Sequence, residues 1–429
     1  MKPIEVKELV EYEISSLFGK DNTLKTIELL ERKNTELCKN LRLHSDAIKI
    51  YKKNKKQMVQ FSGISGVISY SNVEIEIMPK FLNAGIEWRE SLFNMICIAG
   101  SRRIFAQQSS HMAKKQLTFY DHVAIMFIDE MVKALGQDTI HTYRDEEDSS
   151  RFLRGRLLMY AQLEHIITNA GTLYYEHDVF DTENEFNYIL KWCAQSLEAK
   201  VKNNDIRNKL REIGEELPKV SGTYRIPVDA KLPPQYSHYL KALEIANNLA
   251  SGYGSAFQKA EGRGMSYIVP MEVIYEKFIE KILKSLVSEK YSIKSEAQSS
   301  VLFAKAEYTD MKSYYTRPDN KIVINGKPML LIDAKYKNNF VNNRGKKPIN
   351  TDVYQIFASM VSHGCMKGIL ISPCESTESM YSRHWTIEDN GKKYTIYSLM
   401  LNISDISTVS KIRELKRNIL CFIEKELEI

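Results

Sequence analysis

The alternation of apolar and polar residues is clearest within residues 316–337. Two short apolar runs, 323–324 and 329–332, stand on either side of Asn325-Gly326. Because an Asn-Gly pair between apolar runs is a strong signal for a tight turn, this pattern predicts a β-hairpin. The second strand of the hairpin should run directly into the tripeptide Asp333-Ala334-Lys335.

Residues on both sides of this hairpin predict further helices and strands. Apolar residues recur at helical spacing in 270–288; they are Val273, Ile274, Phe278, Ile282 and Leu286. A second helix is expected over 350–363, with Asn350 or Thr351 as its N-cap. Strands are expected at 291–297, 367–373 and 394–401, and a closing amphipathic helix at 407–427. Together these elements indicate an α/β domain.

Upstream of that domain the pattern changes twice. Residues 58–81 alternate and contain turn glycines, which predicts two or three strands, and short strands or helices are expected at 3–18 and 46–51. Helical patterns follow at 86–135, 186–215 and 236–252, with a polar break at 143–150 and a Gly-rich boundary near 255–265. The sequence therefore predicts an α/β multidomain protein with a β-rich domain at 1–85, a mainly helical middle region at 86–260 and a third domain at 261–429.

Composition narrows the class of protein. Of 429 residues, 43% are hydrophobic and 27% are charged, as in ordinary globular proteins, and the net charge of +6 is compatible with a polyanionic partner. Six scattered cysteines without metal-type spacing indicate free thiols in a reducing compartment. The charged N-terminus and the lack of a long apolar stretch predict a cytoplasmic protein that does not span a membrane. Because the sequence has no GxxxxGK[ST] phosphate-binding loop, a partner would have to supply any nucleotide hydrolysis.

The end of the predicted hairpin carries the candidate chemistry. Side chains two positions apart in a strand share a face, so Asp333 and Lys335 should project together. Asp319, in an upstream Pro-Asp pair, should enter at the end of the neighbouring strand. Two carboxylates and an ammonium group could hold a hard divalent cation and orient a water to hydrolyse a phosphodiester. The alternative is an Asp–Lys pair on a solvated strand end. A second Asp-Ala-Lys at 229–231 lacks a preceding aliphatic run and a Pro-Asp pair, which favours a loop.

The Pro-Asp pair followed by Asp-x-Lys resembles the PD-(D/E)xK nuclease superfamily. The sequence DAKYK at 333–337, together with Tyr354-Gln355, is similar to McrC, the nuclease subunit of modification-dependent McrBC restriction systems. Residues 58–81, which contain IEIMPK, also resemble the N-terminal sheet of McrC proteins. The resemblance implies that 261–429 form a restriction-endonuclease-like (PD-(D/E)xK) core with Mg²⁺-dependent endodeoxyribonuclease activity.

The resemblance also implies roles for the residues at the strand ends. Asp319, Asp333 and the backbone carbonyl of Ala334 would bind Mg²⁺ or Mn²⁺. Lys335 would orient or deprotonate the attacking water, and burial together with the charge of the metal would lower its pKa, which suits a base.

Two flanking helices would contribute further side chains. Glu276 would be a third carboxylate near the metal; Glu272 and Glu280 are rival candidates, and an ordinary surface position is the alternative. Gln355 would bind the water, the phosphate or Lys335, unless it serves only in polar packing.

Basic residues follow the tripeptide. Residues 335–347 contain no acid, and their cations could contact the DNA backbone; these are Lys337, Arg344, Lys346 and Lys347. The alternative is a solvated loop. Arg154 and Arg156 could likewise contact nucleic acid or pair with local acids.

The resemblance further implies partners. In McrC proteins the N-terminal region contacts and stimulates an AAA+ GTPase ring, so 1–85 is the expected partner-binding domain, and GTP would enter only through that partner. The substrate would be double-stranded DNA, expected to be modified. Two alternatives stay open: a stand-alone repair or recombination nuclease, and a catalytically idle nuclease-fold adaptor that regulates a GTPase.

Overall fold

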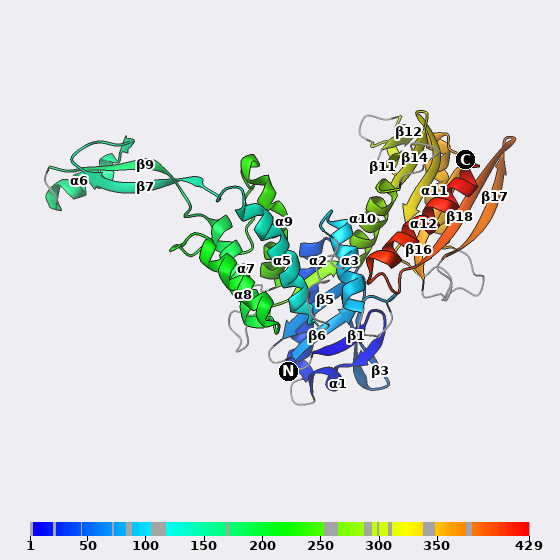
Figure 1. Cartoon of the computed structure of the whole chain (residues 1–429), viewed down its shortest axis with the longest axis horizontal. Helices are drawn as coiled ribbons and strands as arrows, with labels where there is room; N and C mark the ends of the chain where they lie inside the picture. The colour runs from blue at the N-terminus through cyan, green and yellow to red at the C-terminus, as the bar shows by residue number, and fades with distance from the viewer. Residues whose placement is uncertain are drawn as a thin grey trace. The chain divides into compact units, whose positions relative to one another are not determined.

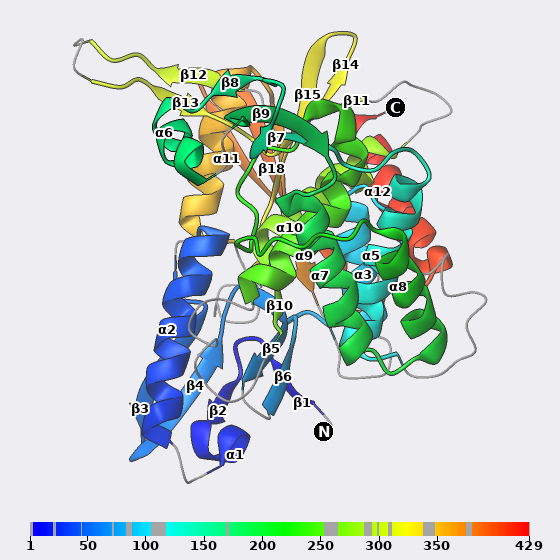
Figure 2. The ribbon, with the colours of Figure 1, turned by 90° about the vertical axis from the view of Figure 1, so that its left-hand side faces the viewer.

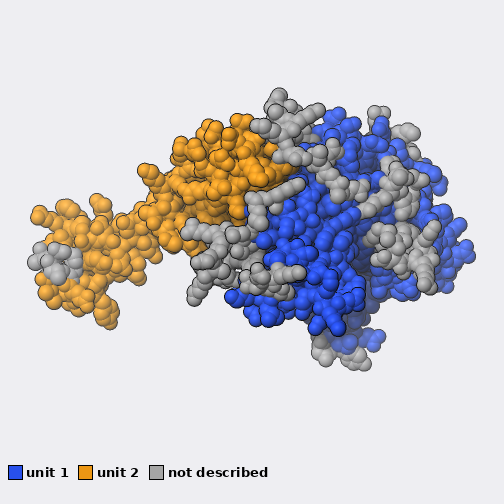
Figure 3. Space-filling model, turned by 90° about the horizontal axis from the view of Figure 1, so that it is seen from below, with its two compact units in different colours: residues 1–116, 268–429 blue, residues 117–267 orange. Residues whose placement is uncertain are grey.

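The computed structural model describes residues 3–19, 23–43, 45–70, 73–82, 88–103, 117–168, 171–252, 265–286, 294–297, 300–307, 311–337, 348–374 and 380–428. The chain forms two compact units: residues 1–116 together with 268–429, and residues 117–267 (Figure 3). Most of the predicted boundary near 255–265 lies outside the described residues. The division into three domains therefore stays a prediction.

The N-terminal part of the first unit contains two small sheets and two helices. One sheet has the order β1 (Ile4–Lys7), β6 (Val73–Met78), β5 (Ile64–Tyr70) and β10 (Tyr267–Pro270). The other has the order β2 (Glu11–Glu13), β4 (Lys56–Phe61) and β3 (Ile48–Lys53), and the helices are α1 (Ile14–Phe18) and α2 (Thr23–Leu41). Their apolar sides meet in one core that includes Leu30, Val59 and Ile75. The strands predicted within 58–81 are thus confirmed, whereas α2 lies outside the predicted elements.

The second part of this unit is built around a six-stranded sheet (Figure 1). Its order is β11 (Lys294–Ala297), β14 (Asn320–Ile324), β15 (Lys327–Ala334), β16 (Lys367–Cys374), β18 (Lys392–Asn402) and β17 (Met380–Asp389). Strands β15, β16 and β18 run parallel, and the other neighbouring pairs run antiparallel. A separate pair, β12 (Val301–Ala304) and β13 (Tyr314–Thr316), forms a two-stranded sheet.

The predicted hairpin is confirmed as β14 and β15. Asn325 and Gly326 join the two strands with φ angles of 52° and 79°. A tight turn with two positive φ angles matches the twist of the flanking strands, which is why Asn-Gly is favoured there. The strands expected at 367–373 and 394–401 are also present as β16 and β18.

Two helices cover opposite faces of this sheet (Figure 2). Helix α11 (Asn350–His363) packs in a core with Leu331, Leu370 and Ile396. The ring of Tyr397, the next residue of β18, meets Phe422 of α12 (Val409–Leu427) at a centroid distance of 5.8 Å. Because consecutive strand residues point to opposite faces, α11 and α12 enclose the sheet from two sides.

Gly368 lets α11 lie close to β16. A β-carbon at Gly368 would lie 2.6 Å from Met360 Sδ and 2.9 Å from Ile356 Cγ1. Both distances are shorter than carbon atoms tolerate in a close-packed interior, so a larger residue would force the helix or its side chains to move.

Two details of the predicted helices were wrong. Helix α10 spans Met271–Lys284 and packs on α3 (Trp88–Ala99), but Val273 of the predicted stripe is 40% exposed while Tyr275 and Ile279 are buried. The buried side is thus turned toward α3, a contact that local periodicity does not reveal. The N-cap of α11 is Ile349, with no side-chain hydrogen bond, so the predicted caps lie inside the first turn.

The second unit contains the predicted helices of the middle region apart from α3, which belongs to the first unit. They are α5 (Phe119–Leu135), α7 (Glu185–Lys200), α8 (Asn204–Glu216), the 3-10 helix η2 (Pro234–Tyr239) and α9 (Leu240–Gly252). Thr118 and Asp121 form a capping box at the start of α5, which satisfies backbone N–H groups of its first turn. Within the described residues, no helix of the protein is long and apolar enough to span a bilayer.

The polar break predicted at 143–150 is a strand instead. Strand β7 (Thr142–Ser150) pairs antiparallel with β9 (Leu173–Asp181), and the connection between them holds β8 (Arg156–Leu157) and α6 (Met159–Thr168). We call the segment from Thr142 to Asp181 the long hairpin (Figure 1). Strand β7 is almost wholly polar and its side chains are half-buried or exposed, so its sequence shows none of the apolar alternation of a half-buried strand.

The base of the long hairpin is held by two buried asparagines. Asn187 Nδ2 donates hydrogen bonds of 2.8 Å and 2.9 Å to the carbonyl oxygens of Ile140 and Thr182, which lie just outside the hairpin. Asn184 Nδ2 donates to the same Ile140 oxygen at 3.0 Å. These bonds fix where the two strands leave the helices.

Candidate active site

Two carboxyl groups meet where β14 begins and β15 ends. Asn320 pairs with Ile332 in the strand register, so Asp319 comes opposite Asp333. The backbone N–H of Ala334 donates a hydrogen bond of 2.8 Å to Asp319 Oδ2, and Asp333 is 2% exposed. The structure thus brings together the two acids that the sequence singled out.

The Asp319 carboxyl has a strongly perturbed acidity. Burial raises its pKa to about 8, with the negative charges of Asp333 and Glu276 adding to the effect against the hydrogen bond from Ala334. A carboxyl in this setting releases its proton more readily when positive charge is near. The two acids therefore form a site that favours a cation.

Lys335 lies directly beside this acid pair. Its Nζ is 2.7 Å from Asp333 Oδ2 and 3.3 Å from Gln355 Oε1. Burial lowers the pKa of Lys335, but the carboxylate of Asp333 and the more distant acids outweigh burial and raise that pKa above its ordinary value. Paired charge thus dominates over desolvation in the metal-free protein, and the lowering expected with a metal bound stays a prediction. Lys335 is therefore held as an ammonium group.

Gln355 and Glu276 reach the pair from two helices. Gln355 is exposed in the second turn of α11 and contacts Lys335, as one of its predicted roles requires. Glu276 is half-buried on α10 and acts on Asp319 through its charge. Among the described residues, no group of three His, Cys, Asp or Glu side chains is disposed to hold a metal. The metal-binding role of Glu276 stays a prediction.

The donor set fits a hard cation nevertheless. Two carboxylates and the backbone carbonyl of Ala334 are all oxygen donors, the ligand type that Mg²⁺ and Mn²⁺ prefer. Burial raises the pKa of Asp319, and the negative charges of Asp333 and Glu276 raise it further, so a bound cation would favour the ionised carboxyl.

One acid in this region escaped the sequence analysis. Asp352, in the first turn of α11, is 3% exposed and accepts bonds of 3.0 Å and 3.4 Å from Lys337 Nζ. Lys337, predicted to contact DNA, is thus paired with an acid within the protein. The sequence signal for Asp352 is its place in the first turn of a predicted helix, and acids are common there in ordinary helices. The other predicted DNA contacts, Arg344, Lys346 and Lys347, lie outside the described residues.

The second Asp-Ala-Lys and the predicted arginine pair are also located. Residues 229–231 are exposed and lie in a loop before η2, as expected. Arg156 pairs with Glu176 across the long hairpin at 2.5 Å, so the alternative of a local acid partner is the one observed.

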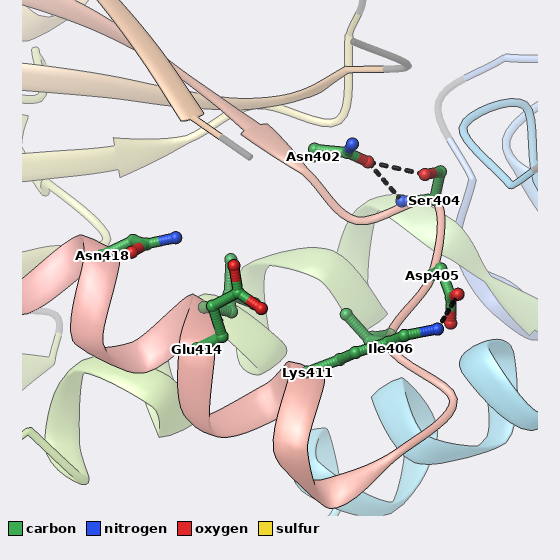
Figure 4. A pocket seen from close by; sticks show the side chains of 8 residues that line it. Asn402, Ser404, Asp405, Ile406, Lys411, Glu414 and Asn418 are labelled. Carbon is green, nitrogen blue, oxygen red and sulfur yellow. Dashed lines mark hydrogen bonds and ion pairs between the residues drawn. The ribbon is translucent and has the colours of Figure 1, made fainter. Parts of the chain in front are cut away.

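A pocket of about 210 Å³ lies elsewhere, between the end of β18 and the start of α12 (Figure 4). Its polar groups bond one another: Asn402 accepts from Ser404, and Lys411 pairs with Asp405 (Figure 4). None of the predicted site residues lines it. The pocket is therefore a feature of the connection between β18 and α12, separate from the acid pair.

Comparison with known proteins adds the family. No curated protein matches the chain significantly. Among solved structures, a chain from an assembly of Thermococcus gammatolerans McrB AAA+ hexamers with bound McrC matches with a TM-score of 0.61 and 15% identity, over 97% of this chain and 100% of that one. A chain of the Thermococcus gammatolerans McrBC complex matches with a TM-score of 0.46 and 17% identity, over 66% of this chain and 88% of that one.

The first of these matches shows a shared fold across nearly the whole chain. The model of the family described as "McrBC 5-methylcytosine restriction system component" matches residues 59–373. Since that range is well over half of the 429 residues, the chain belongs to the McrBC restriction system component family, as its motifs predicted.

Proposed function

We propose that the protein is the nuclease subunit of a McrBC-type restriction complex, which hydrolyses phosphodiester bonds of DNA carrying modified cytosine. The observation that carries this proposal is the convergence of Asp319, Asp333 and Lys335 at one pair of strand ends. Family membership supports a restriction role, and the PD-(D/E)xK pattern supports hydrolysis by this core.

The residues of the site divide the chemistry among them. Asp319, Asp333 and the Ala334 carbonyl would hold Mg²⁺ or Mn²⁺. When bound, such a cation supplies Lewis acidity, which lowers the pKa of a coordinated water and offsets charge on the phosphate.

Lys335 acts as a cation in this scheme. Its ammonium group, 2.7 Å from Asp333 Oδ2, would donate hydrogen bonds, offset negative charge in the transition state and orient the attacking water. Gln355, 3.3 Å from the Lys335 Nζ, limits where that ammonium group can lie.

The partner in this proposal is an AAA+ GTPase. The solved assembly that shares this fold contains McrB AAA+ hexamers with bound McrC, and the same kind of ring would bind this chain. GTP would then enter the reaction only through that ring. The N-terminal region 1–85, predicted from the resemblance to contact the ring, remains one proposed contact.

The long hairpin offers a second contact surface for the ring. Eight of its large apolar side chains are at least 50% exposed: Tyr143, Phe152, Leu153, Met159, Tyr160, Leu163, Ile167 and Phe180. Apolar groups gathered on one element mark a protein interface more often than an ordinary surface. We include the hairpin in the proposed interface on this ground.

The nuclease proposal is tested by DNA cleavage in the full complex. With the AAA+ partner, GTP, Mg²⁺ and DNA bearing 5-methylcytosine, Asp333→Asn should lower the cleavage rate by roughly 10³-fold or more, because the site loses a charged ligand. EDTA should abolish cleavage by the wild type. Asp229→Asn, in the loop copy of the tripeptide, is the matched control and should cut normally. Wild-type cleavage by Asp333→Asn would refute the proposal.

A further inference from the structure

Three residues far apart in the sequence form a buried cluster next to the candidate site. Glu8 follows β1, Lys80 follows β6, and Tyr336 is the residue after Lys335. Glu8 is 2% exposed and Tyr336 is 5% exposed. We call these three residues the anchor cluster.

The anchor cluster holds Tyr336 at three points. The Tyr336 hydroxyl donates a hydrogen bond of 2.8 Å to Glu8 Oε2. Lys80 Nζ donates one of 3.0 Å to the Tyr336 carbonyl oxygen and lies 4.1 Å from the centre of its ring. The ring of Phe81 packs edge-on against Tyr336 at a centroid distance of 5.3 Å. The backbone, ring and hydroxyl of this residue are therefore all fixed by the N-terminal sheet.

Glu8 is in turn held by backbone groups of that sheet. The N–H of Gly63, just before β5, donates to Glu8 Oε1 at 2.8 Å, and the N–H of Lys80 donates to Oε2 at 3.2 Å. A buried carboxylate is tolerated where such donors and a cation surround it, and Lys80 Nζ lies 3.9 Å from Oε1. The carboxylate thus gives Tyr336 a rigid acceptor.

The same contacts extend to the helix that carries Glu276. The carbonyl oxygen of Gly63 accepts a hydrogen bond of 2.9 Å from the N–H of Met271, the first residue of α10. The Tyr275 ring, next to Glu276 in sequence, packs against the Tyr336 ring at a centroid distance of 5.8 Å. Both elements that bring side chains to Asp319 are therefore tied to the N-terminal sheet.

The position of Lys335 depends on these ties. Its own N–H donates to the Ile371 oxygen of β16 at 2.8 Å, which fixes the peptide before it. The peptide after Tyr336 is fixed by Lys80. With that bond removed, the chain beyond β15 could turn, and the Lys335 side chain would no longer be confined beside Asp333.

We propose that Glu8, Lys80 and Tyr336 are positioning residues, through which the N-terminal sheet sets the location of the Lys335 ammonium group for catalysis. This inference rests on the proposed nuclease function. None of the three would touch DNA or metal; they act through Lys335. The N-terminal sheet then has a role in the chemical step in addition to any contact with a partner.

Single-turnover cleavage in the full complex tests this inference. Lys80→Met should lower the cleavage rate constant by roughly 10²-fold at saturating DNA, because a displacement of about 1 Å can cost that much. DNA affinity and GTP hydrolysis should stay unchanged, and Lys80→Arg, which keeps a cationic donor, should recover part of the rate. Lys133→Met is the matched control, since Lys133 forms an exposed pair with Asp129 on α5, outside the proposed sites.

A tyrosine pair gives a second and gentler test. Tyr336→Phe removes only the hydroxyl that bonds Glu8 and should lower the rate less than Lys80→Met does. Tyr275→Phe is its control, because the Tyr275 hydroxyl has no hydrogen-bond partner among the described residues. Normal rates in both folded Lys80→Met and Tyr336→Phe would overturn the inference. Losses of cleavage rate that are explained by lower DNA affinity or a lower melting temperature would also overturn it. If Asp333→Asn also cut normally, the nuclease function itself would fall.

Discussion

The hairpin of β14 and β15 buries charged side chains, whereas the long hairpin of β7 and β9 exposes apolar ones. The first carries Asp333 into a setting where it is 2% exposed, and a cation lies against it. The second carries Tyr160 at 92% and Ile167 at 85% exposure. Buried charge is costly unless it is paired, and exposed apolar surface is costly unless it is covered. The first hairpin therefore has the character of a reaction site, and the second that of a binding surface.

The two hairpins also differ in how the sequence shows them. In β14–β15 the turn is two residues long, and the apolar runs on both sides belong to strands inside a larger sheet. In β7–β9 the connecting segment holds a short strand and a helix of its own, and among the side chains of β7 and β9 only Tyr175 is fully buried. A short sequence motif therefore predicts a hairpin only when the turn is tight and the flanking strands are buried.

The largest expected effect separates the two copies of the tripeptide. Lys335→Met should slow single-turnover cleavage by roughly 10²–10⁴-fold, because the ammonium group beside Asp333 is lost. Lys231→Met, in the exposed loop copy, should leave the rate unchanged. Rates measured in the full complex decide between them, and the reverse order would mean that the reaction site lies at 229–231.

A smaller effect is expected at the long hairpin. Tyr160→Ser should weaken binding of the AAA+ partner by roughly 30-fold, the usual loss at an aromatic position central to an interface. Its melting temperature should not change, since the side chain is 92% exposed. Val132→Ser, an exposed apolar position on α5, is the control. Equal affinity of wild type and Tyr160→Ser for the ring, measured by fluorescence anisotropy, would remove the hairpin from the proposed interface.

The last expected effect concerns the dependence of stability on pH. The pKa of Asp319 is raised from its ordinary 3.8 to about 8, so the folded protein binds more protons than the unfolded chain between these values. Stability should therefore fall as pH rises from about 4 to 8, by at most about 1.4 kcal/mol per pH unit from this group. Melting temperatures in EDTA should show the slope, and Asp319→Asn should flatten it. An identical slope in the variant would contradict the assigned pKa.

Much of the strand-end geometry could be predicted because its causes are local. Asn325-Gly326 fixes the turn, and a one-residue shift of register between Ile322 and Val323 then brings Asp319 opposite Asp333. The partners Asp352 and Glu8 could not be predicted, because each meets its lysine or tyrosine only after distant segments pack. The direction of the Lys335 pKa in the metal-free protein likewise depends on how many acids the fold gathers around it.

Gly368 constrains the site through packing and not through charge. Since a single methyl group at this position would collide with Ile356 and Met360, the depth of α11 on the sheet is set by the absence of one carbon atom. Gln355 and Asp352 are carried on the same helix, so their reach toward Lys335 and Lys337 depends on that depth. Gly368→Ala would thus change the distances from Gln355 and Asp352 to these lysines through added side-chain volume alone. Every ligand and hydrogen-bonding residue would be unchanged.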